Sequence, residues 1–417
     1  MFKCQITIRK STKCCSNKSI PGWKQSCITY FNRYFQRFVY LILWLAGLTL
    51  VGFFQYSTTK DIKQKHPSKI CQPITDVMFL KTHKTASSTI LNILYRFSEK
   101  HNLTMALPYG NEAHLGYPRP FHASYVEEFK TLENKFNIMA NHLRFNWQQV
   151  RRIMPNNTFY FSVLRHPALL LESSYVYYKT YSPAFRKSKN VNEFLSSPGS
   201  YYNMTEQNNI YAKNNMWFDF GYNNNAKYDK SYIQFVLKKI EEIFHLILIA
   251  DFFDESMILL KDFLCWDLDD VIYFKLNARS QENIQTLNPE NKEKVKEWCA
   301  LDWELYKHFN KSFWMKIRER MDLKTLYKEV DLLQKRQKEL METCLLEETA
   351  IEHYQVKDKK MKPFQGENAG IMGYNLRQDL DNKTLNICTK MIMPELQYTA
   401  HLYNSQFPFK KKKTFVR

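Results

Sequence analysis

The chain has 417 residues, enough for one large domain or two ordinary ones. Its 44% hydrophobic and 15% aromatic content excludes a disordered chain. The formal net charge of +19 indicates an anionic partner, which composition alone allows to be nucleic acid, a membrane surface or a phosphorylated or sulfated small molecule.

The N-terminal segment predicts a membrane anchor. Residues 1–37 contain eight Lys or Arg residues and no Asp or Glu. An uncharged apolar run follows at 38–54, FVYLILWLAGLTLVGFF, just long enough for a thin bilayer at about 1.5 Å per residue. Because the positive flank precedes the run, we expect a cytosolic tail, a transmembrane signal anchor at 38–54, a stem at 55–72 and a lumenal domain at 73–417. A cleaved signal peptide and a buried core helix are the alternatives.

Sequons and cysteines agree with a lumenal domain, which would exclude nucleic acid as a partner. Asparagines in N-x-[ST] sequons predict glycosylation at Asn102, Asn156, Asn203, Asn310 and Asn382. The cysteines after the apolar run are Cys71, Cys265, Cys299, Cys344 and Cys388. They contain no CxxC pair, so zinc is not indicated. Some should form disulfides, and because five is an odd number at least one stays free or pairs between chains.

Apolar runs alternating with helical patterns predict an α/β domain. The strands are expected at 76–80, 136–140, 158–164 and 245–250. Helices are expected at 88–100, at 255–264 and through the charged, periodic segment 290–345, the last as one long exposed helix ending near Cys344. Continuous apolar strands indicate a mostly parallel central sheet with helices on both faces. The basic end, FKKKKTFVR, is interpreted as a solvated tail, with contact to anionic lipid as the alternative.

Residues 79–89, FLKTHKTASST, lie between the first expected strand and helix. Unpaired N–H groups and the helix dipole favour an anion at such a junction. Lys81 and Lys84 add charge, and hydroxyl donors come from Thr82, Thr85, Ser87, Ser88 and Thr89. The loop has no glycine and no GK[ST], which argues against a Walker A loop and a metal-assisted kinase. Ser87 or Ser88 is expected to be the N-cap of the helix at 88–100. The alternative to an anion site is an N-capped turn with exposed lysines.

A second anion site is indicated in SVLRHPALLLESSYVYYK, residues 162–179. Arg165 ends a strand, Pro167 starts a helix, and Ser173 lies about two helical turns further on. The alternative is an arginine at the sheet edge with a helix-buried serine. Two anion sites at the ends of parallel strands indicate a ligand with phosphate groups at both ends.

These residues carry a resemblance to a known family. Lys84, Thr85, Ala86, Ser87, Ser88 and Thr89 resemble the 5′-phosphosulfate loop of sulfotransferases, and Arg165 with Ser173 resembles their 3′-phosphate site. The motifs NHLRF, FDFGY, FFDES, LLKDFLCW, YFKLNAR, HFNKSFW and GYNL extend the resemblance over about 76–400 to the galactose-3-O-sulfotransferase family, and within it most nearly to the enzymes that sulfate galactosylceramide. His166 is a departure, because the family usually has Asp there.

The resemblance implies a P-loop-like sulfotransferase fold in a single-pass type II Golgi membrane enzyme. It implies transfer of the sulfuryl group of 3′-phosphoadenosine 5′-phosphosulfate (PAPS) to the 3-hydroxyl of a β-galactose, without metal. The expected acceptor is galactosylceramide or a related glycolipid, giving sulfatide. A fixed cation at the departing phosphate would stabilise the transition state, and Lys84 is expected there with Lys81 at the rim. Alternatives are sulfation of galactose on glycoprotein glycans, uronosyl 2-O-sulfation of heparan, or a non-catalytic glycan-binding membrane protein. A homodimer is one of the assemblies that the sequence allows.

A histidine is expected to take the proton of the acceptor hydroxyl. His83 lies inside the loop beside Lys84, where neighbouring cations disfavour its protonation. His142 follows an expected strand, at the edge where open α/β sheets bind ligands, and uronosyl 2-O-sulfotransferases resemble the chain here and use a histidine in a similar segment. We therefore predict His142 as the base, with His83 as the alternative and an unidentified carboxylate as the third choice.

Overall fold

The computed structural model describes residues 71–110, 112–130, 135–366 and 369–412. Nearly all of them belong to one compact unit, Gln72–Arg417. The predicted tail, signal anchor and nearly all of the stem lie outside the described residues. Within those residues, no helix combines the length and apolarity needed to cross a membrane.

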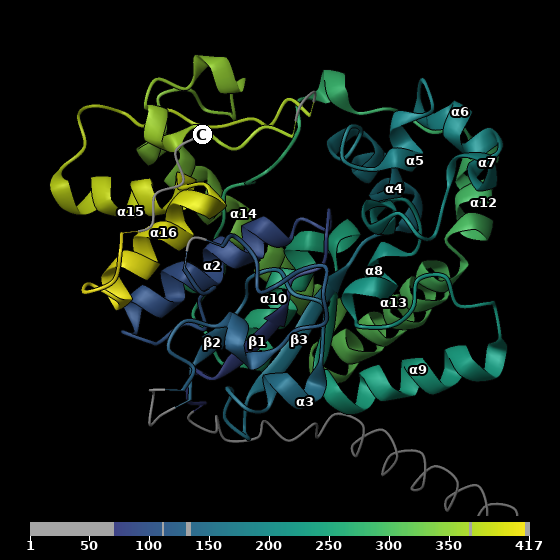
Figure 1. Ribbon diagram of the computed structural model, residues 1–417. Coiled ribbons are helices and arrows are strands. Elements are labelled where there is room, and N and C mark those ends of the chain that lie inside the picture. The colour runs from purple at the N-terminus through teal and green to yellow at the C-terminus, as the bar shows by residue number, and fades with distance from the viewer. Residues whose placement is uncertain (1–70, 111, 131–134, 367–368, 413–417) are drawn as a thin grey trace, which may run out of the picture. The chain divides into compact units, whose positions relative to one another are not determined.

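A parallel four-stranded sheet forms the centre of the unit, as the sequence predicted (Figure 1). Its spatial order is β2 (Ile138–Met139), β1 (Val77–Leu80), β3 (Phe159–Leu164) and β4 (Leu246–Ile249). Every residue of these strands is buried, which is why they read as unbroken apolar runs rather than as alternating patterns.

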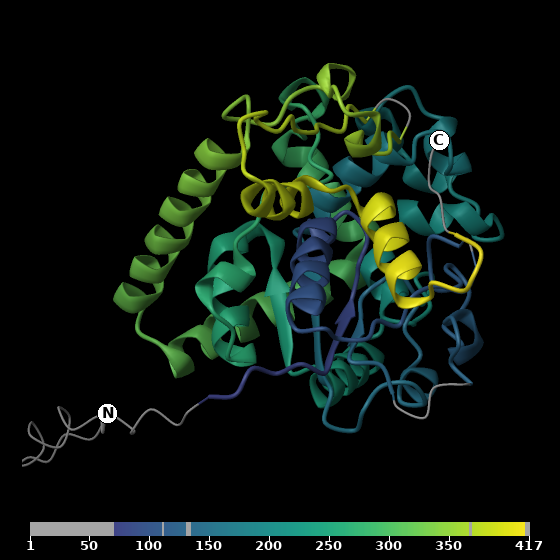
Figure 2. The ribbon, with the colours of Figure 1, turned by 90° about the vertical axis from the view of Figure 1, so that its left-hand side faces the viewer.

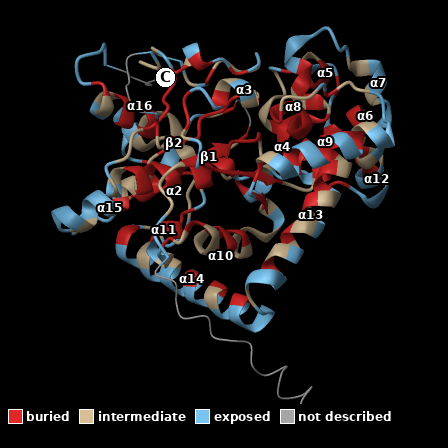
Figure 3. Ribbon diagram, turned by 90° about the horizontal axis from the view of Figure 1, so that it is seen from below, coloured by how far each residue is buried: buried red, intermediate tan, exposed pale blue. Residues whose placement is uncertain are grey.

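Helices cover the sheet and enclose the main core. α10 (Phe253–Leu264) and α13 (Ala300–Arg320) pack against β4. α2 (Ser87–Lys100) follows β1 and lies beside the C-terminal helices α15 (Asn382–Ile392) and α16 (Glu395–Gln406), which Figure 2 shows in dark blue and yellow. Burial is concentrated at the strands, whereas the outer faces of α14 (Leu323–Cys344) and α15 are exposed (Figure 3).

A second apolar cluster lies beside the sheet. It includes Leu171, Tyr175, Phe185 and Phe194, and it ties α4 (Pro167–Tyr177) to the short helices that follow it. Further helices of the described part are α3 (Trp147–Val150), α5 (Pro183–Arg186), α6 (Val191–Ser196), α7 (Pro198–Tyr201), α8 (Asn215–Asp219), α9 (Lys230–Ile243) and α11 (Leu268–Val271). Short 3-10 helices occur at Ala123–Tyr125, Gln207–Ala212, Ala250–Phe252, Gln281–Asn283, His353–Gln355 and Lys359–Met361.

The prediction of one long exposed helix over 290–345 is wrong. The segment is helical, but it forms α12 (Pro289–Trp298), α13 and α14 (Leu323–Cys344). α14 starts anew because the carboxylate of Asp322 accepts a hydrogen bond from the N–H of Thr325 and so caps it. α13 is not exposed along its length, because one face, including Phe309 and Phe313, enters the core.

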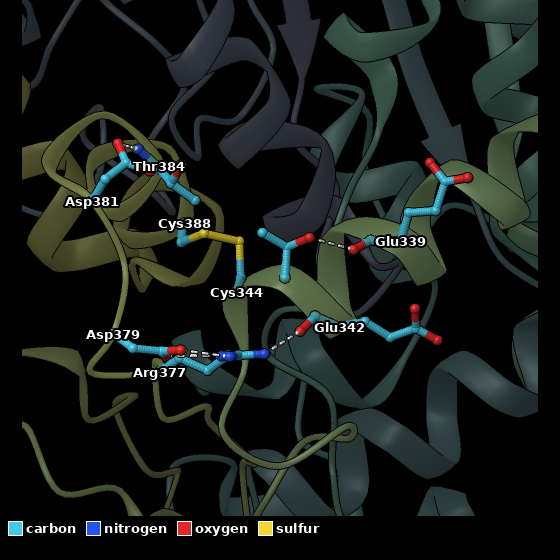
Figure 4. Close-up of a disulfide and its surroundings, with 9 residues drawn as sticks. Glu339, Glu342, Cys344, Arg377, Asp379, Asp381, Thr384 and Cys388 are labelled. Atoms are coloured by element: carbon cyan, nitrogen blue, oxygen red, sulfur yellow. Dashed lines mark hydrogen bonds and ion pairs between the residues drawn. A yellow bond between two sulfur atoms is a disulfide. The ribbon is translucent and has the colours of Figure 1, made fainter.

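Disulfides confirm the expectation drawn from the cysteines. Cys344 at the end of α14 is bonded to Cys388 in α15 across 44 residues of chain (Figure 4). A closed loop of that length stabilises the fold by about 4 kcal/mol in the chain-entropy model. Cys71 and Cys265 are also disulfide-bonded. Cys299 is the free cysteine of the described part, and burial raises the pKa of its thiol to about 12, so it is unreactive at neutral pH.

Candidate functional site

The site is built at the carboxyl edge of the sheet. Lys81 follows β1, His142 lies three residues beyond β2, Arg165 follows β3 and Asp251 lies two residues beyond β4. Because all four strands are parallel, these side chains start from one edge. Ligands of open α/β sheets bind there.

The loop between β1 and α2 has the shape of an anion cradle. Lys84 and Ala86 adopt left-handed conformations, with φ of 57° and 60°. Each costs about 1–2 kcal/mol for a residue other than glycine, and such strain gathers at functional sites. Between described residues, no hydrogen bond engages the backbone N–H groups of 84–88. Several N–H groups and the start of α2 are therefore free to face an anion.

The loop hydroxyls mainly hold this shape. The Thr82 hydroxyl donates to the carbonyl of Val163 at 2.5 Å, and it lies 2.8 Å from that of Thr85. The hydroxyl of Ser87 donates to the carbonyl of Thr82 at 2.6 Å. The predicted serine cap of α2 is wrong: its N-cap is Ala86, which has no capping side chain, because the Ser87 hydroxyl turns back into the loop.

The side chains of Lys84, Arg165 and Arg279 place three positive charges at the loop. The guanidinium of Arg165 donates to the carbonyl of Lys84 at 3.0 Å, and the ammonium of Lys84 lies 3.5 Å from the centre of the Tyr177 ring. Burial lowers the pKa of Lys84 well below its ordinary value, and the nearby charges of Arg279 and Arg165 lower it further. Clustered positive charge of this kind is stabilised by a bound anion.

Arg279 is a site residue that sequence reasoning missed. Its guanidinium makes a buried bidentate pair with Glu172 on α4, with N–O distances of 3.0 and 2.6 Å. Such a fork fixes the guanidinium plane. The signal was present, because Arg279 ends YFKLNAR and Glu172 lies in LLLESS, two of the motifs that carry the resemblance. Ser173 lies next to Glu172, is buried, and its hydroxyl bonds to no other described residue.

His166 caps a helix, as an Asp at this position would also be able to do. It is the N-cap of α4, where its Nδ1 accepts a hydrogen bond from the N–H of Ala168 at 3.2 Å. Burial lowers its pKa, which keeps the imidazole neutral and able to accept. A carboxylate is still supplied near Arg165 by Asp251, whose oxygen accepts from the N–H of His166 at 2.9 Å.

His83 is held by a buried carboxylate. Its Nδ1 lies 3.0 Å from an oxygen of Asp219, and its backbone N–H donates to the other oxygen at 2.8 Å. The hydroxyl of Tyr117 donates to the same carboxylate at 2.9 Å. A carboxylate accepts, so the Nδ1 of His83 carries the proton and Nε2 is the free, basic nitrogen. In the described part, no residue hydrogen-bonds to that Nε2.

His142 lies against His83 but is bonded differently. The two rings stack with centroids 3.9 Å apart. The Nδ1 of His142 donates to the carbonyl of Lys81 at 2.9 Å, and its Nε2 lies 2.7 Å from the ammonium of the same lysine. Both ring nitrogens are thus engaged. Burial lowers the pKa of His142 well below the ordinary value, and His83 and Lys81 add to the effect.

The prediction that Lys81 lies at the rim of the site is wrong. Lys81 is buried, with 2% of its surface exposed. Its ammonium pairs with Glu395 of α16 at 3.1 Å, and Glu395 also accepts from the hydroxyl of Ser88 at 2.7 Å. Burial raises the pKa of Glu395, but Lys81 and Ser88 outweigh this and hold it below the ordinary value. The C-terminal helix therefore contributes a carboxylate that no local pattern indicated.

Three tyrosines form a wall beside His83. The rings of Tyr178 and Tyr211 stack at 3.8 Å, and the centroid of Tyr211 lies 5.5 Å from that of His83. The centroid of the Tyr117 ring lies 4.4 Å from that of His83 and 6.3 Å from that of Tyr211. All three tyrosines are half-buried. Half-buried aromatic faces with polar tips suit a ligand with one apolar face and several hydroxyls, such as a sugar.

The five predicted glycosylation sites differ in their exposure. Four sequon asparagines are exposed, whereas Asn310 lies inside α13 with its side-chain oxygen buried. No group of three or more His, Cys, Asp or Glu residues within the described ranges is arranged to hold a metal ion.

A parallel sheet with a strained cationic loop at its carboxyl edge, and a carboxylate-held histidine in that loop, is suited to bind an anionic donor and to accept a proton, as a group transferase requires. The family model of galactose-3-O-sulfotransferase matches residues 27–406. The chain belongs to this family, and the match extends beyond the expected 76–400 at both ends, to residues 27 and 406.

Similar proteins refine this placement. Galactose-3-O-sulfotransferase 2 of Mus musculus is 52% identical over 387 residues, which are 92% of this chain and 97% of that protein. The protein of the same name from Homo sapiens is 49% identical, covering 92% and 96%. Galactosylceramide sulfotransferase of Homo sapiens is 39% identical over 336 residues, covering 80% and 79%. The likeness to galactosylceramide sulfotransferase is present but weaker than that to galactose-3-O-sulfotransferase 2.

Proposed function

We propose that the protein transfers the sulfuryl group of PAPS to the 3-hydroxyl of a β-galactose. Family membership supports the reaction class, and a sulfotransferase of this family implies PAPS as donor. PAPS supplies an activated sulfuryl group: the bond from sulfur to the bridging phosphate oxygen breaks as the bond from sulfur to the galactose oxygen forms. The residues present fit this donor, because unpaired N–H groups and three cations gather around one loop.

In this proposal the two ends of the donor meet different residues. Lys84 and the N–H groups of 84–88 bind the phosphosulfate end, and Lys84 stabilises the charge that develops on the leaving oxygen. Arg165 and Ser173 bind the 3′-phosphate, as expected from the sequence, and we add Arg279, which Glu172 orients. Thr82, Thr85 and Ser87 contribute by holding the loop in its strained shape.

The observation that carries the mechanism is the contact between His83 and Asp219. It leaves Nε2 of His83 free to take the proton of the acceptor hydroxyl, while Asp219 stabilises the imidazolium that results. His142 has neither nitrogen free and a strongly lowered pKa, which makes it the weaker base. We therefore propose His83 as the base in place of His142, and we place His142 and Lys81 behind it as supports.

The proposed acceptor is a terminal β-galactose, and the molecule to which this galactose is attached is considered next from the similar proteins. The stronger likeness to galactose-3-O-sulfotransferase 2 favours an acceptor that is not restricted to galactosylceramide. Galactosylceramide stays the alternative. We further propose a single-pass type II protein of the Golgi membrane with a lumenal catalytic domain, on the pattern of charge and apolarity in residues 1–54.

Transfer of labelled sulfate from PAPS by the purified full-length protein tests the proposal. The acceptors are galactosylceramide, a disaccharide ending in β-galactose, and desulfated heparan. We expect label on the galactose 3-hydroxyl and none on heparan. Label on uronic acid, or no transfer to any acceptor, would exclude the proposed reaction.

A further inference from the structure

The C-terminal helix α16 brings a carboxylate to the loop between β1 and α2. α16 lies beside α2 (Figure 2), and Glu395 is its first residue. One oxygen of Glu395 accepts a hydrogen bond from the hydroxyl of Ser88 at 2.7 Å and lies 3.1 Å from the ammonium of Lys81. Lys81 precedes the strained turn of the loop and Ser88 follows it, so a single carboxylate oxygen joins the two sides of the loop.

Lys81 extends this contact to the two histidines. Its ammonium lies 2.7 Å from Nε2 of His142, and the ring of His142 stacks on that of His83 with an interplanar angle of 10°. An ammonium can only donate, so Nε2 of His142 accepts and the ring is held in one tautomer and one plane. The position of the Lys81 ammonium therefore fixes the surface against which His83 packs.

A second chain of hydrogen bonds leads from α16 to the same place. The hydroxyl of Thr399 donates to the carbonyl of Glu395 at 2.8 Å, and it lies 2.7 Å from the hydroxyl of Tyr95. The Tyr95 hydroxyl in turn accepts from the amide of Asn141 at 3.0 Å. Thr399, Tyr95 and Asn141 are buried, and Asn141 directly precedes His142. Buried hydrogen-bond chains make the elements that they join rigid, so α16 is fixed relative to His142.

The charge of Glu395 matters as well as its hydrogen bonds. Lys81 is buried, and burial lowers the pKa of its ammonium. Glu395 opposes this lowering of the pKa more strongly than Asp219 does. The other titratable groups near Lys81, whose positive forms would repel its charge, are Lys84, His114 and His142. Glu395 therefore supplies the counter-charge that keeps a buried ammonium beside His142.

We infer that Glu395 is a positioning residue for sulfuryl transfer. It holds the Lys81 ammonium against His142, and the imidazole of His83 is thereby kept in place to receive the acceptor proton. The inference rests on the proposed function, in which His83 is the base. Burial raises the pKa of Glu395, but Lys81 and Ser88 hold it below the ordinary value, so Glu395 is itself a poor base.

The test measures kcat at saturating PAPS and acceptor and, separately, equilibrium binding of PAPS. It uses the purified full-length protein and a disaccharide ending in β-galactose. Glu395→Gln keeps an oxygen that accepts hydrogen bonds but removes the counter-charge of Lys81. We expect kcat to fall about 10- to 100-fold, because a displaced base loses its alignment with the acceptor hydroxyl, and PAPS affinity to stay within about threefold. If this variant does not fold, Glu395→Asp, which keeps the charge but withdraws it by one methylene, should lower kcat about tenfold.

Glu99→Gln is the matched control. Glu99 lies at the opposite end of α2 from Ser88, and its partners on the C-terminal helices are Lys390, Tyr398 and His401. The change loosens the same helices but leaves the contact between Lys81 and Glu395 in place. The melting temperature should therefore fall, while kcat of the folded variant should stay within about twofold of wild type.

A double variant shows whether Glu395 acts through Lys81. Lys81→Met alone should lower kcat, and adding Glu395→Gln to it should change kcat by less than about threefold, because residues that act as one unit are not additive. A further loss of tenfold or more in the double variant would mean that Glu395 acts independently of Lys81, and it would overturn the inference.

Other outcomes separate this inference from the proposed function. A wild-type kcat in folded Glu395→Gln overturns the inference. An equal decrease of kcat in Glu395→Gln and Glu99→Gln also overturns it and assigns Glu395 to the docking of α16 alone. A loss of PAPS affinity at unchanged kcat overturns it and assigns Glu395 to donor binding. No transfer by the wild type overturns the proposed function, and the inference falls with it.

Discussion

Replacing Asp219 by asparagine tests the proposed base most directly. Asp219 is fully buried and accepts from the ring Nδ1 and backbone N–H of His83 and from the hydroxyl of Tyr117. An asparagine has nearly the same shape, but only its oxygen accepts. The amide nitrogen of the asparagine would face the protonated Nδ1 of His83, and two donors repel each other. The repulsion disappears when the proton of the imidazole moves from Nδ1 to Nε2. The nitrogen that should take the acceptor proton would then be blocked.

The size of the effect follows from this change of tautomer. A positioned general base contributes about 10²–10⁴ to the rate, so Asp219→Asn should lower kcat by that factor, or about 3–5 kcal/mol in activation free energy. The buried acceptor that is lost should cost about 1–3 kcal/mol in the free energy of unfolding. Donor binding should change little, because Asp219 contacts none of Lys84, Arg165 and Arg279 directly.

The assay measures kcat for sulfate transfer and, separately, equilibrium binding of PAPS to each folded variant. Tyr117→Phe is the matched comparison: it removes one hydrogen bond from the same carboxylate but keeps the contact with His83, so kcat should fall less than tenfold. His83→Ala should lose most turnover together with the acidic limb of the pH–rate profile.

One result would refute the reasoning. If Asp219→Asn and His83→Ala both turn over within about threefold of wild type, while His142→Ala binds PAPS normally and loses turnover by the 10²-fold or more expected for a general base, then His142 is the base. The original sequence prediction would then be correct, and the contact of His83 with Asp219 would serve only to shape the loop.

Four further predictions concern the donor site, the pH dependence of stability and the membrane topology. Lys84→Ala should lower kcat by about 10² or more in the transfer assay, with PAPS binding reduced less, because its charge acts on the leaving oxygen. Arg279→Ala should weaken PAPS binding in titrations and cost about 3–5 kcal/mol in the free energy of unfolding by denaturant, since Glu172 is left buried and unpaired; an unchanged affinity would remove Arg279 from the donor site. Burial raises the pKa of the Asp302 carboxyl from 3.8 to about 7, so folding takes up a proton. The contribution of this carboxyl to the free energy of unfolding is therefore largest below pH 4 and is lost as the pH rises to about 7. Denaturant unfolding between pH 4 and 7 should show that slope, worth up to roughly 4 kcal/mol, and Asp302→Asn should flatten it; an unaltered slope would contradict the assignment. Protease added to sealed Golgi vesicles should spare the chain beyond about residue 60, and digestion of its bulk would exclude the proposed topology.

Local patterns in the sequence determined the framework of the site. Unbroken apolar runs fixed the strands, because a strand covered on both faces must be apolar at every position. A loop that follows such a strand and precedes a helix lies at the carboxyl edge of the sheet, so Lys84, His83 and Arg165 could be placed there from sequence alone. The family followed from the order of short motifs, each of which is contiguous in the chain.

Tertiary structure decided which groups meet these residues. Asp219 lies 136 positions from His83, Glu395 lies 307 from Ser88, and Arg279 lies 107 from Glu172. Side-chain periodicity reports burial and local conformation, but it does not say which buried charge faces which. The choice between the histidines depended on that information. His83 and His142 both follow strands of one sheet. Only the packing of α8 against the loop brings the carboxylate of Asp219 to His83, whereas His142 is bonded to Lys81. A buried ionisable group is stable only where the fold brings a partner to it.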